Sequence, residues 1–88
     1  MTLQEAQRVI RGPSVLVPAH MVAANVLFES DDSTLDDLLA CARHRYRNIA
    51  WMGAFALQRR TGRPEGRDER GYLVIDADDW ERYLRSQK

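Results

Sequence analysis

The longest helical pattern in the chain runs from about residue 34 to residue 60. Apolar and small residues recur there at three- and four-residue spacing, which places them on one face of a helix with about 3.6 residues per turn. The residues on this face are Leu35, Leu38, Leu39, Ala42, Tyr46, Ile49, Gly53, Ala56 and Leu57. The pattern therefore predicts one long central helix whose apolar face belongs to the core.

The length of this helix is itself a constraint. A helix of about 26 residues spans roughly 40 Å, whereas a compact domain of this size has a diameter of roughly 30 Å. We therefore expect the helix to break within residues 43–48, to overhang the domain, or to be covered by a second subunit. The sequence alone does not choose among these three arrangements.

Two shorter helices are expected before the central one. The first runs from Thr2 to about Arg11, because Thr2 and Glu5 have the spacing of a capping box and Gly12 is followed by a proline. Gly12 is expected in the left-handed conformation. The second, over residues 18–28, is apolar on nearly every side, and its β-branched residues leave a strand as the alternative.

The remaining pattern predicts a small β element and a last helix. Residues 14–17 and 71–75 are short β-branched stretches, which suggest a two-stranded pairing, with residues 63–68 as the other candidate arm for 71–75. A C-terminal helix over 77–86 begins after the cap Asp76, and its apolar stripe is expected to cover Trp51 and Phe55. The predicted fold is mainly α, α+β at most, in a single domain over residues 1–88.

Composition adds bounds to this picture. The 88 residues are 44% hydrophobic and 30% charged, which is typical of one globular domain. A single cysteine, Cys41, excludes an internal disulfide and favours a reducing compartment. The apolar block over 49–57 is too short to cross a bilayer, and the chain opens without a secretory signal. We therefore expect a cytoplasmic protein with no membrane partner.

No catalytic, metal or cofactor motif is visible in the sequence. His20 and His44 lie far apart with Cys41 between them, which is not the spacing of a zinc site. His44 is expected to be solvated and Cys41 to be a passive thiol. No phosphate-binding loop or nucleophile motif is present. The chain is therefore predicted not to be an enzyme and to need no cofactor.

The acidic segment 29–37 has a structural explanation. Asp32 and Asp36 share a helix face, as ligands of a divalent metal would, but Ser33 and Asp36 also have the spacing of a capping box. Acidic residues are favoured at a helix N-terminus by its dipole. Capping accounts for all of these acids, so no metal site is predicted.

Charge is balanced overall but segregated along the chain. The 13 basic and 13 acidic residues cancel, while residues 29–37 are acidic and residues 43–70 are rich in arginine. Arginine pairs bidentately with carboxylate or phosphate. These arginines are therefore expected either to bind the acids of the chain itself or to contact a partner.

The leading functional hypothesis is a non-enzymatic regulatory or inhibitory protein that occupies a macromolecular partner, either a protein or a ribonucleoprotein. Anti-CRISPR and anti-repressor proteins carried by phages and mobile elements have this size and style. A homodimer joined along residues 49–57 is compatible with it. The residues predicted to bind the partner are Arg43, Arg45, Arg47, Trp51, Phe55, Asp31 and Asp32.

The alternative is a DNA-binding regulator. Residues 71–84, GYLVIDADDWERYL, preceded by RRTGRP over 59–64, resemble the wing strand and closing helix of excisionase-type and other MerR-like winged helices. The resemblance covers about a quarter of the chain. It implies a helix-turn-helix immediately upstream, where this sequence has an unbroken helical pattern ending in AWMGAFAL. The residues that would then contact phosphates are Arg59, Arg60, Arg63, Arg67 and Arg70.

Overall fold

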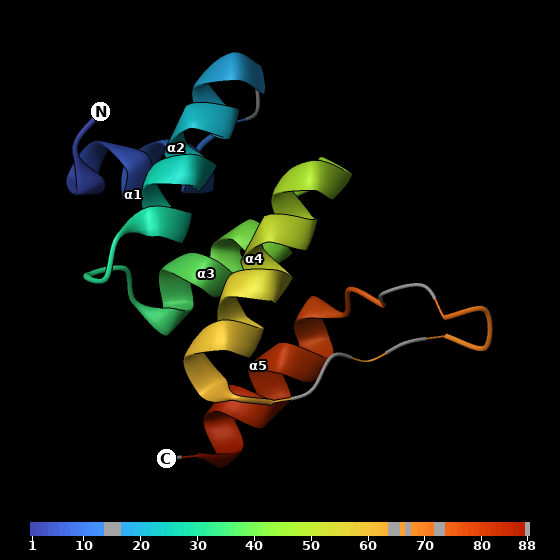
Figure 1. The fold of residues 1–88 in the computed structure, drawn as a ribbon. Helices are drawn as coiled ribbons and strands as arrows, with labels where there is room; N and C mark the ends of the chain where they lie inside the picture. The colour runs from blue at the N-terminus through green and yellow to red at the C-terminus, as the bar shows by residue number, and fades with distance from the viewer. Residues whose placement is uncertain (14–16, 64–65, 67, 72–73, 88) are drawn as a thin grey trace.

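The computed structural model describes residues 1–13, 17–63, 66, 68–71 and 74–87, which form five helices (Figure 1). The helices are α1 (Leu3–Arg11), α2 (Val17–Glu29), α3 (Leu35–Ala42), α4 (Arg47–Thr61) and α5 (Ala77–Ser86). The prediction of a mainly α-helical protein is confirmed. No helix among the described residues is both long enough and apolar enough to span a membrane.

The first two helices largely follow their local signals. The Thr2 hydroxyl accepts a hydrogen bond from the Glu5 amide and begins α1 as predicted. Gly12, however, ends α1 with φ −85° and ψ 179°, which is extended backbone and not the predicted left-handed conformation. α2 is a helix, so the strand alternative for residues 18–28 is wrong, and it begins at Val17.

No single uninterrupted helix over 34–60 is found, because residues 43–46 divide it into α3 and α4. Of the three expected arrangements, the break within residues 43–48 is therefore confirmed. α3 begins at a capping box formed by Thr34 and Asp37, one residue later than the predicted Ser33 pair. At the break, the amide of Tyr46 donates to Nδ1 of His44 at 3.1 Å, so it does not continue the helical ladder. The turn lets the chain fold back within a longest extent of 36 Å.

The predicted two-stranded β element is also wrong where the structure describes it. Val17 is the first residue of α2, and residues 71 and 74–75 belong to no strand. Residues 14–16 and 72–73 lie outside the described part of the chain. The alternative pairing with residues 63–68 is represented by one backbone bond, in which the Val74 amide donates to the Gly66 carbonyl at 2.9 Å.

α3 and α4 lie between the α1–α2 pair and α5 (Figure 1), and apolar clusters fill both sides. The cluster toward α1 and α2 contains Ala6, Ile10, Ala23, Ala24, Leu27, Cys41 and Ile49. The cluster toward α5 contains Leu38, Leu39, Ala42, Ala56, Leu57 and Trp80. The two sides of α3 and α4 are therefore both core surfaces, which explains why α4 is apolar nearly all round.

A glycine permits the close crossing of α3 and α4. A Cβ added at Gly53 would overlap the amide of Ala42 and would stand 2.7 Å from the carbonyl oxygen of Leu38. These are backbone atoms, which cannot rotate away as a side chain can. The two helix backbones therefore touch at Gly53 with no room for a side chain.

Asp37 ties α1 to the start of α3. Its carboxylate is 2% exposed and accepts bonds from the Gln7 side chain at 2.8 Å and the Thr34 amide at 3.0 Å. The guanidinium of Arg11 pairs with its other oxygen at 2.8 Å. Burial opposes ionisation, but these partners outweigh it and hold the Asp37 pKa below its usual value of 3.8.

Candidate partner-binding surface

Three stacked aromatic rings form a row across α2 and α4, named here the aromatic row. The rings of Trp51 and Phe55, one turn apart on α4, have centroids 5.3 Å apart and an interplanar angle of 14°. Phe28 of α2 stacks on Phe55 at 6.0 Å and 19°. Trp51 remains 46% exposed. The prediction that the last helix covers Trp51 and Phe55 is therefore wrong, since Phe55 is covered by its neighbouring rings and Trp51 faces solvent.

α5 packs on a different part of the core. Its Trp80, 7% exposed, lies in the cluster formed by α3 and the second half of α4. Arg43, at the end of α3, pairs with Asp78 at 2.9 Å and with Glu81 at 3.0 Å and so links the α3–α4 turn to α5. These contacts direct α5 away from the exposed side of Trp51.

Two arginines of α4, Arg47 and Arg59, flank the rings of Trp51 and Phe55 along the helix. Arg47, Trp51, Phe55 and Arg59 follow one another at four-residue spacing, which places them along one side of the helix. The guanidinium of Arg59 lies 5.6 Å from the centroid of the Phe28 ring. Neither Arg47 nor Arg59 forms an ion pair within the described part of the chain. The side therefore combines an apolar centre with positive charge at both ends.

The acidic turn between α2 and α3 reaches the Arg59 end of this side. Asp31 and Phe28 line, with Arg59, a hollow of about 340 Å³ between the end of α2 and the second half of α4. Asp32 is exposed in the same turn, where its amide is bonded to the Ser30 hydroxyl at 3.2 Å. Of the predicted partner residues, the structure thus brings together Trp51, Phe55 and Asp31.

The other predicted partner residues have different positions. Both guanidinium nitrogens of Arg43 are bonded to α5. Arg45, in the α3–α4 turn, lies over the ring of Tyr46 at 5.4 Å from its centroid. Arg47 is exposed at the start of α4. Arg43 is therefore a structural residue, as the alternative of pairing within the chain predicted.

The arginines predicted to contact DNA do not form one free face. Arg60 donates to the carbonyl oxygens of Ser33 and Ser30 at 2.6 and 2.7 Å and so holds the α2–α3 turn. Arg63 pairs with Asp79, and its guanidinium lies 4.9 Å from the Trp80 ring centroid. Arg59 lies over the Phe28 ring of the aromatic row, and Arg70 is exposed. Arg67 lies outside the described residues.

A histidine pair that the sequence did not predict joins α2 to the turn between α3 and α4. His20 of α2 is 3% exposed, and its Nδ1 lies 2.9 Å from Nε2 of His44. The prediction of a solvated His44 is wrong, because its ring is partly buried and both ring nitrogens have hydrogen-bond partners. Burial, then interaction with His20 and Arg45, lowers its pKa below 6.5. The two histidines are 24 positions apart, so no local spacing signals their contact.

Cys41 is buried in the first core cluster and not on a helix flank. Burial and, second, the charge of Asp37 raise the pKa of its thiol to about 12. The expectation of a passive thiol agrees with this environment. Among the described residues no group of three or more His, Cys, Asp or Glu side chains is placed to hold a metal ion.

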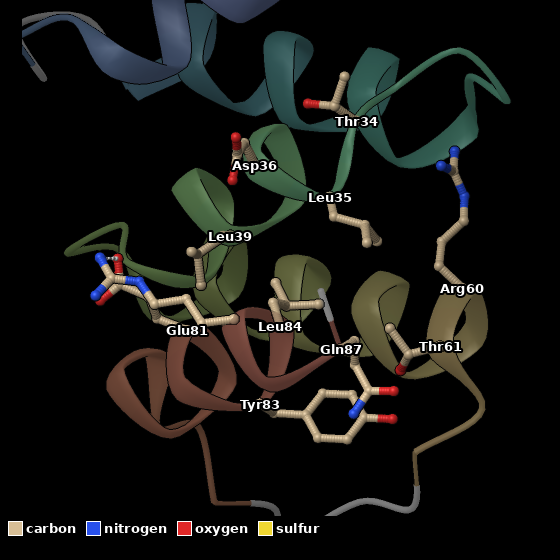
Figure 2. A pocket seen from close by; sticks show the side chains of 11 residues that line it. Thr34, Leu35, Asp36, Leu39, Arg60, Thr61, Glu81, Tyr83, Leu84 and Gln87 are labelled. Atoms are coloured by element: carbon tan, nitrogen blue, oxygen red, sulfur yellow. Dashed lines mark hydrogen bonds and ion pairs between the residues drawn. The ribbon is translucent and has the colours of Figure 1, made fainter.

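A groove of about 690 Å³ separates the start of α3, the end of α4 and α5 (Figure 2). Leu35, Leu39 and Leu84 contribute its apolar lining. Leu35, predicted for the core face, is in fact 39% exposed here. Two charged residues at the rim, Arg60 and Glu81, already bind other groups of the chain. The groove is therefore a weaker partner surface than the aromatic row, whose arginines form no ion pair with the described residues.

Comparisons with protein families, with curated proteins and with solved structures find no match to this chain. The feature with the clearest functional meaning is the aromatic row with Arg47 and Arg59.

Proposed function

We propose that this chain is a non-enzymatic regulatory protein that occupies a protein partner through the aromatic row and its two arginines. The observation that carries the proposal is the half-exposed Trp51, held by ring stacking on a helix and flanked by cations that no described acid neutralises. Small inhibitors carried by phages and mobile elements, such as anti-CRISPR and anti-repressor proteins, act by occupancy of this kind.

Exposed aromatic side chains are favourable anchors for protein binding. Trp, Tyr and Arg are enriched among the residues that contribute most to protein–protein affinity. Stacking between Trp51 and Phe55 restricts both side chains before a partner arrives, so less side-chain entropy is lost on binding. The row also lies on α4, whose backbone is fixed by packing on both core clusters.

The charges indicate what kind of segment fits this side of α4. An apolar centre favours an apolar side chain of the partner, whereas the positive ends favour carboxylates. We therefore expect a partner segment with an aromatic or aliphatic residue at its centre and acidic residues on both sides. A phosphate backbone has no apolar group to cover Trp51 and fits the centre less well.

The proposal is tested by affinity capture with matched surface variants. The wild type and the variants Trp51→Ala and Arg59→Glu are immobilised and exposed to a host lysate. The controls are Val74→Ala, which truncates a side chain on a residue as exposed as Trp51 (46%), and Arg8→Glu, which reverses an exposed charge on α1. The expected result is a protein retained by the wild type and both controls and lost from both test variants.

The affinity change is then measured with the purified partner. Trp51→Ala is expected to weaken binding by about 30-fold or more, the effect of a contact residue that contributes about 2 kcal/mol. A partner that binds Trp51→Ala and Val74→Ala equally would exclude the aromatic row as its site.

A second copy of the chain is another occupant of the same side. Within 49–57, the residues that are not buried in the subunit are Trp51, Met52 and Phe55, so a homodimer would join there. Light scattering on the wild type and on Phe55→Glu distinguishes the cases. A dimer that becomes a folded monomer in Phe55→Glu would identify a second copy as the occupant, whereas a monomeric wild type leaves the side open for another protein.

One observation favours the second candidate function, DNA binding. Because of the break at residues 43–46, two helices joined by a turn, α3 and α4, lie upstream of the segment that resembles a wing. The backbone bond between Val74 and Gly66 closes that segment, and α5 follows it. This order is the one that the resemblance to winged helices implies. Arg47 and Asn48 are exposed at the start of α4, where a recognition helix contacts DNA.

Fluorescence anisotropy with labelled duplex DNA at two salt concentrations tests this candidate. Binding through phosphates would weaken steeply with salt, with a log–log slope of about −0.9 for each phosphate neutralised. Arg47→Glu should then reduce both affinity and slope, while Arg8→Glu should not. The absence of binding at low salt would reject the DNA-binding function.

A further inference from the structure

The two histidines belong to a chain of hydrogen bonds in which every proton has a defined place. The Tyr46 amide donates to His44 Nδ1 at 3.1 Å, so this nitrogen must be unprotonated. His44 therefore carries its proton on Nε2 and donates it to His20 Nδ1 at 2.9 Å. His20 in turn carries its proton on Nε2, which lies 3.2 Å from the carbonyl oxygen of Pro13. This pattern of bonds requires the Nε2–H tautomer in both rings.

This chain of bonds joins three parts of the fold. Pro13 follows the end of α1, His20 lies in α2, and His44 lies in the turn that separates α3 from α4. Tyr46 is the N-cap residue of α4 and has no side-chain capping bond of its own. The contact with His44 is thus the side-chain interaction that fixes the backbone where α4 begins.

A second proton on either ring would break one of these bonds. On His44 it would sit on Nδ1 and face the N–H of Tyr46, so that two donors would oppose each other. On His20 it would sit on Nδ1 and face the Nε2 proton of His44. An imidazolium that loses an acceptor in this way is disfavoured, most of all at the buried His20 and also at the partly buried His44.

The surroundings do not compensate for such a charge. The described hydrogen-bond and ring partners of the pair are the Pro13 carbonyl, the Tyr46 amide and the Tyr46 ring, which stacks on His44 with centroids 5.3 Å apart. Besides His20, the charged group that lowers the pKa of His44 is Arg45, which is also positive. None of these groups is a carboxylate that would stabilise an imidazolium.

We propose that His20 and His44 form a pH-sensitive latch, which holds the start of α4 on α2 only while both rings are neutral. The latch opens when the solution becomes acidic enough to protonate a ring. Because α2 carries Phe28 and α4 carries Trp51 and Phe55, the same contact helps to set the spacing of the aromatic row. The consequence for partner binding rests on the proposed function; the latch itself does not.

The first test uses the unmodified protein and NMR of its ring nitrogens. At pH 7.5 both rings should show the Nε2–H tautomer, and His44 should titrate below 6.5, together with the amide signal of Tyr46. His44 titrating at or above 6.5, or either ring in the Nδ1–H tautomer, would overturn the latch. This test needs no variant and therefore does not depend on how well a variant folds.

The second test compares stability across the histidine range. The folded-state pKa of His44 lies below its unfolded value of 6.5, so the unfolded chain binds the extra proton first. The stability from the latch is then complete above 6.5 and is lost as pH falls through the folded-state pKa. For each proton that only the unfolded chain binds, the unfolding equilibrium constant rises by at most about tenfold when the pH falls by one unit.

The matched control is the double variant His20→Gln/His44→Asn. Asn at position 44 keeps an acceptor for the Tyr46 amide, and Gln at position 20 keeps a donor for Pro13, but neither titrates. Between pH 7 and 5.5 the wild type should lose stability and the double variant should not. Equal pH slopes for the two proteins would contradict the latch.

The link to the aromatic row is tested separately, by capturing the partner at pH 7.5 and at a pH below the His44 pKa that the NMR titration measures. The wild type should retain less partner at the lower pH, while the double variant should retain similar amounts at both values. Equal retention of the partner by the wild type at both pH values would reject regulation by the latch. Equal retention by the wild type and Trp51→Ala would instead reject the proposed surface, so the two failures are distinguishable.

Discussion

Gly53 of α4 lies directly against the backbone of Ala42, the last residue of α3, with no space for a Cβ between them. The two helices thus share a contact that depends on the absence of a side chain. It lies in the middle of the molecule, where α4 passes between the two apolar clusters. The position of α4, and with it that of Trp51, depends on this contact.

Gly53→Ala should therefore destabilise the fold. Alanine is a better helix former than glycine by about 1 kcal/mol, but overpacking against fixed backbone costs about 1–3 kcal/mol or more. We expect a net loss of about 2 kcal/mol in the free energy of unfolding, measured by urea denaturation. Gly66→Ala is the control, because a Cβ there meets no atom within 4 Å. An unchanged midpoint for Gly53→Ala would show that the helices can separate freely.

Asp37 should contribute more to stability than its neighbour Asp36. Asp37→Asn weakens the bonds to Gln7, Arg11 and Thr34, and we expect a cost of about 1–3 kcal/mol, since a buried side chain loses its negative charge and one of its two acceptor oxygens. The part due to Arg11 is screened, because that side chain is 43% exposed. Asp36→Asn, at an exposed position of the same helix turn, is the control.

The effect of Asp37→Asn should depend on pH in a defined direction. The folded-state pKa of Asp37 is lowered, so its contribution is complete above the unfolded value of 3.8 and is lost as pH falls through the folded-state pKa. The difference in unfolding free energy between wild type and Asp37→Asn should be constant between pH 5 and 7. It should shrink below pH 3.8. A difference that grows on acidification would contradict the assigned role.

The ends of a helix could be predicted from the sequence where a capping residue or a glycine marks them. Thr2 and Asp76 cap α1 and α5 through their own side chains, and α5 has the predicted limits, 77–86. Gly62 ends α4 with φ 74°, in the left-handed conformation that glycine favours after the end of a helix. Each of these signals involves residues within one helical turn of each other, so the sequence contains all of the relevant chemistry.

Features that depend on residues far apart in the chain followed from the sequence only in part. Helix length indicated a break within 43–48 as one of three arrangements, but no Gly or Pro marks it. The break depends on the bond from the Tyr46 amide to the His44 ring and on α4 crossing α3 at Gly53. The pairing of His20 with His44 likewise needs the tertiary fold. The four-residue spacing of Arg59 from Phe55, in contrast, was visible and would have extended the predicted surface.

The buried thiol of Cys41 gives a prediction about reactivity. Burial and the nearby Asp37 charge raise its pKa to about 12, so the thiolate fraction at pH 8 is on the order of 10⁻⁴. We expect an aromatic disulfide reagent to react with the native protein only as fast as the protein opens. In denaturant, one thiol per chain should react at once. Rapid labelling of the native protein, independent of added urea, would show that Cys41 is accessible.

The two tryptophans should differ sharply when truncated. Trp80 is 7% exposed within the α3–α4–α5 cluster and lies under the guanidinium of Arg63. Trp80→Ala should therefore cost about 3–5 kcal/mol, as the loss of a buried aromatic side chain does. Trp51 is 46% exposed and stacks on one side only. Trp51→Ala should cost about 1 kcal/mol or less, since an aromatic pair contributes about 0.5–1.5 kcal/mol beyond its burial and nearly half of this residue already faces solvent.

Urea denaturation of both variants, followed by circular dichroism, measures the contrast. The expected pattern is a folded Trp51→Ala with a near-native midpoint and a severely destabilised Trp80→Ala. Comparable losses for both would mean that Trp51 supports the fold as Trp80 does, and its exposure would then not indicate a binding role. A stable Trp51→Ala that has also lost its partner would instead separate the function of this residue from folding, which is the distinction that the proposed surface requires.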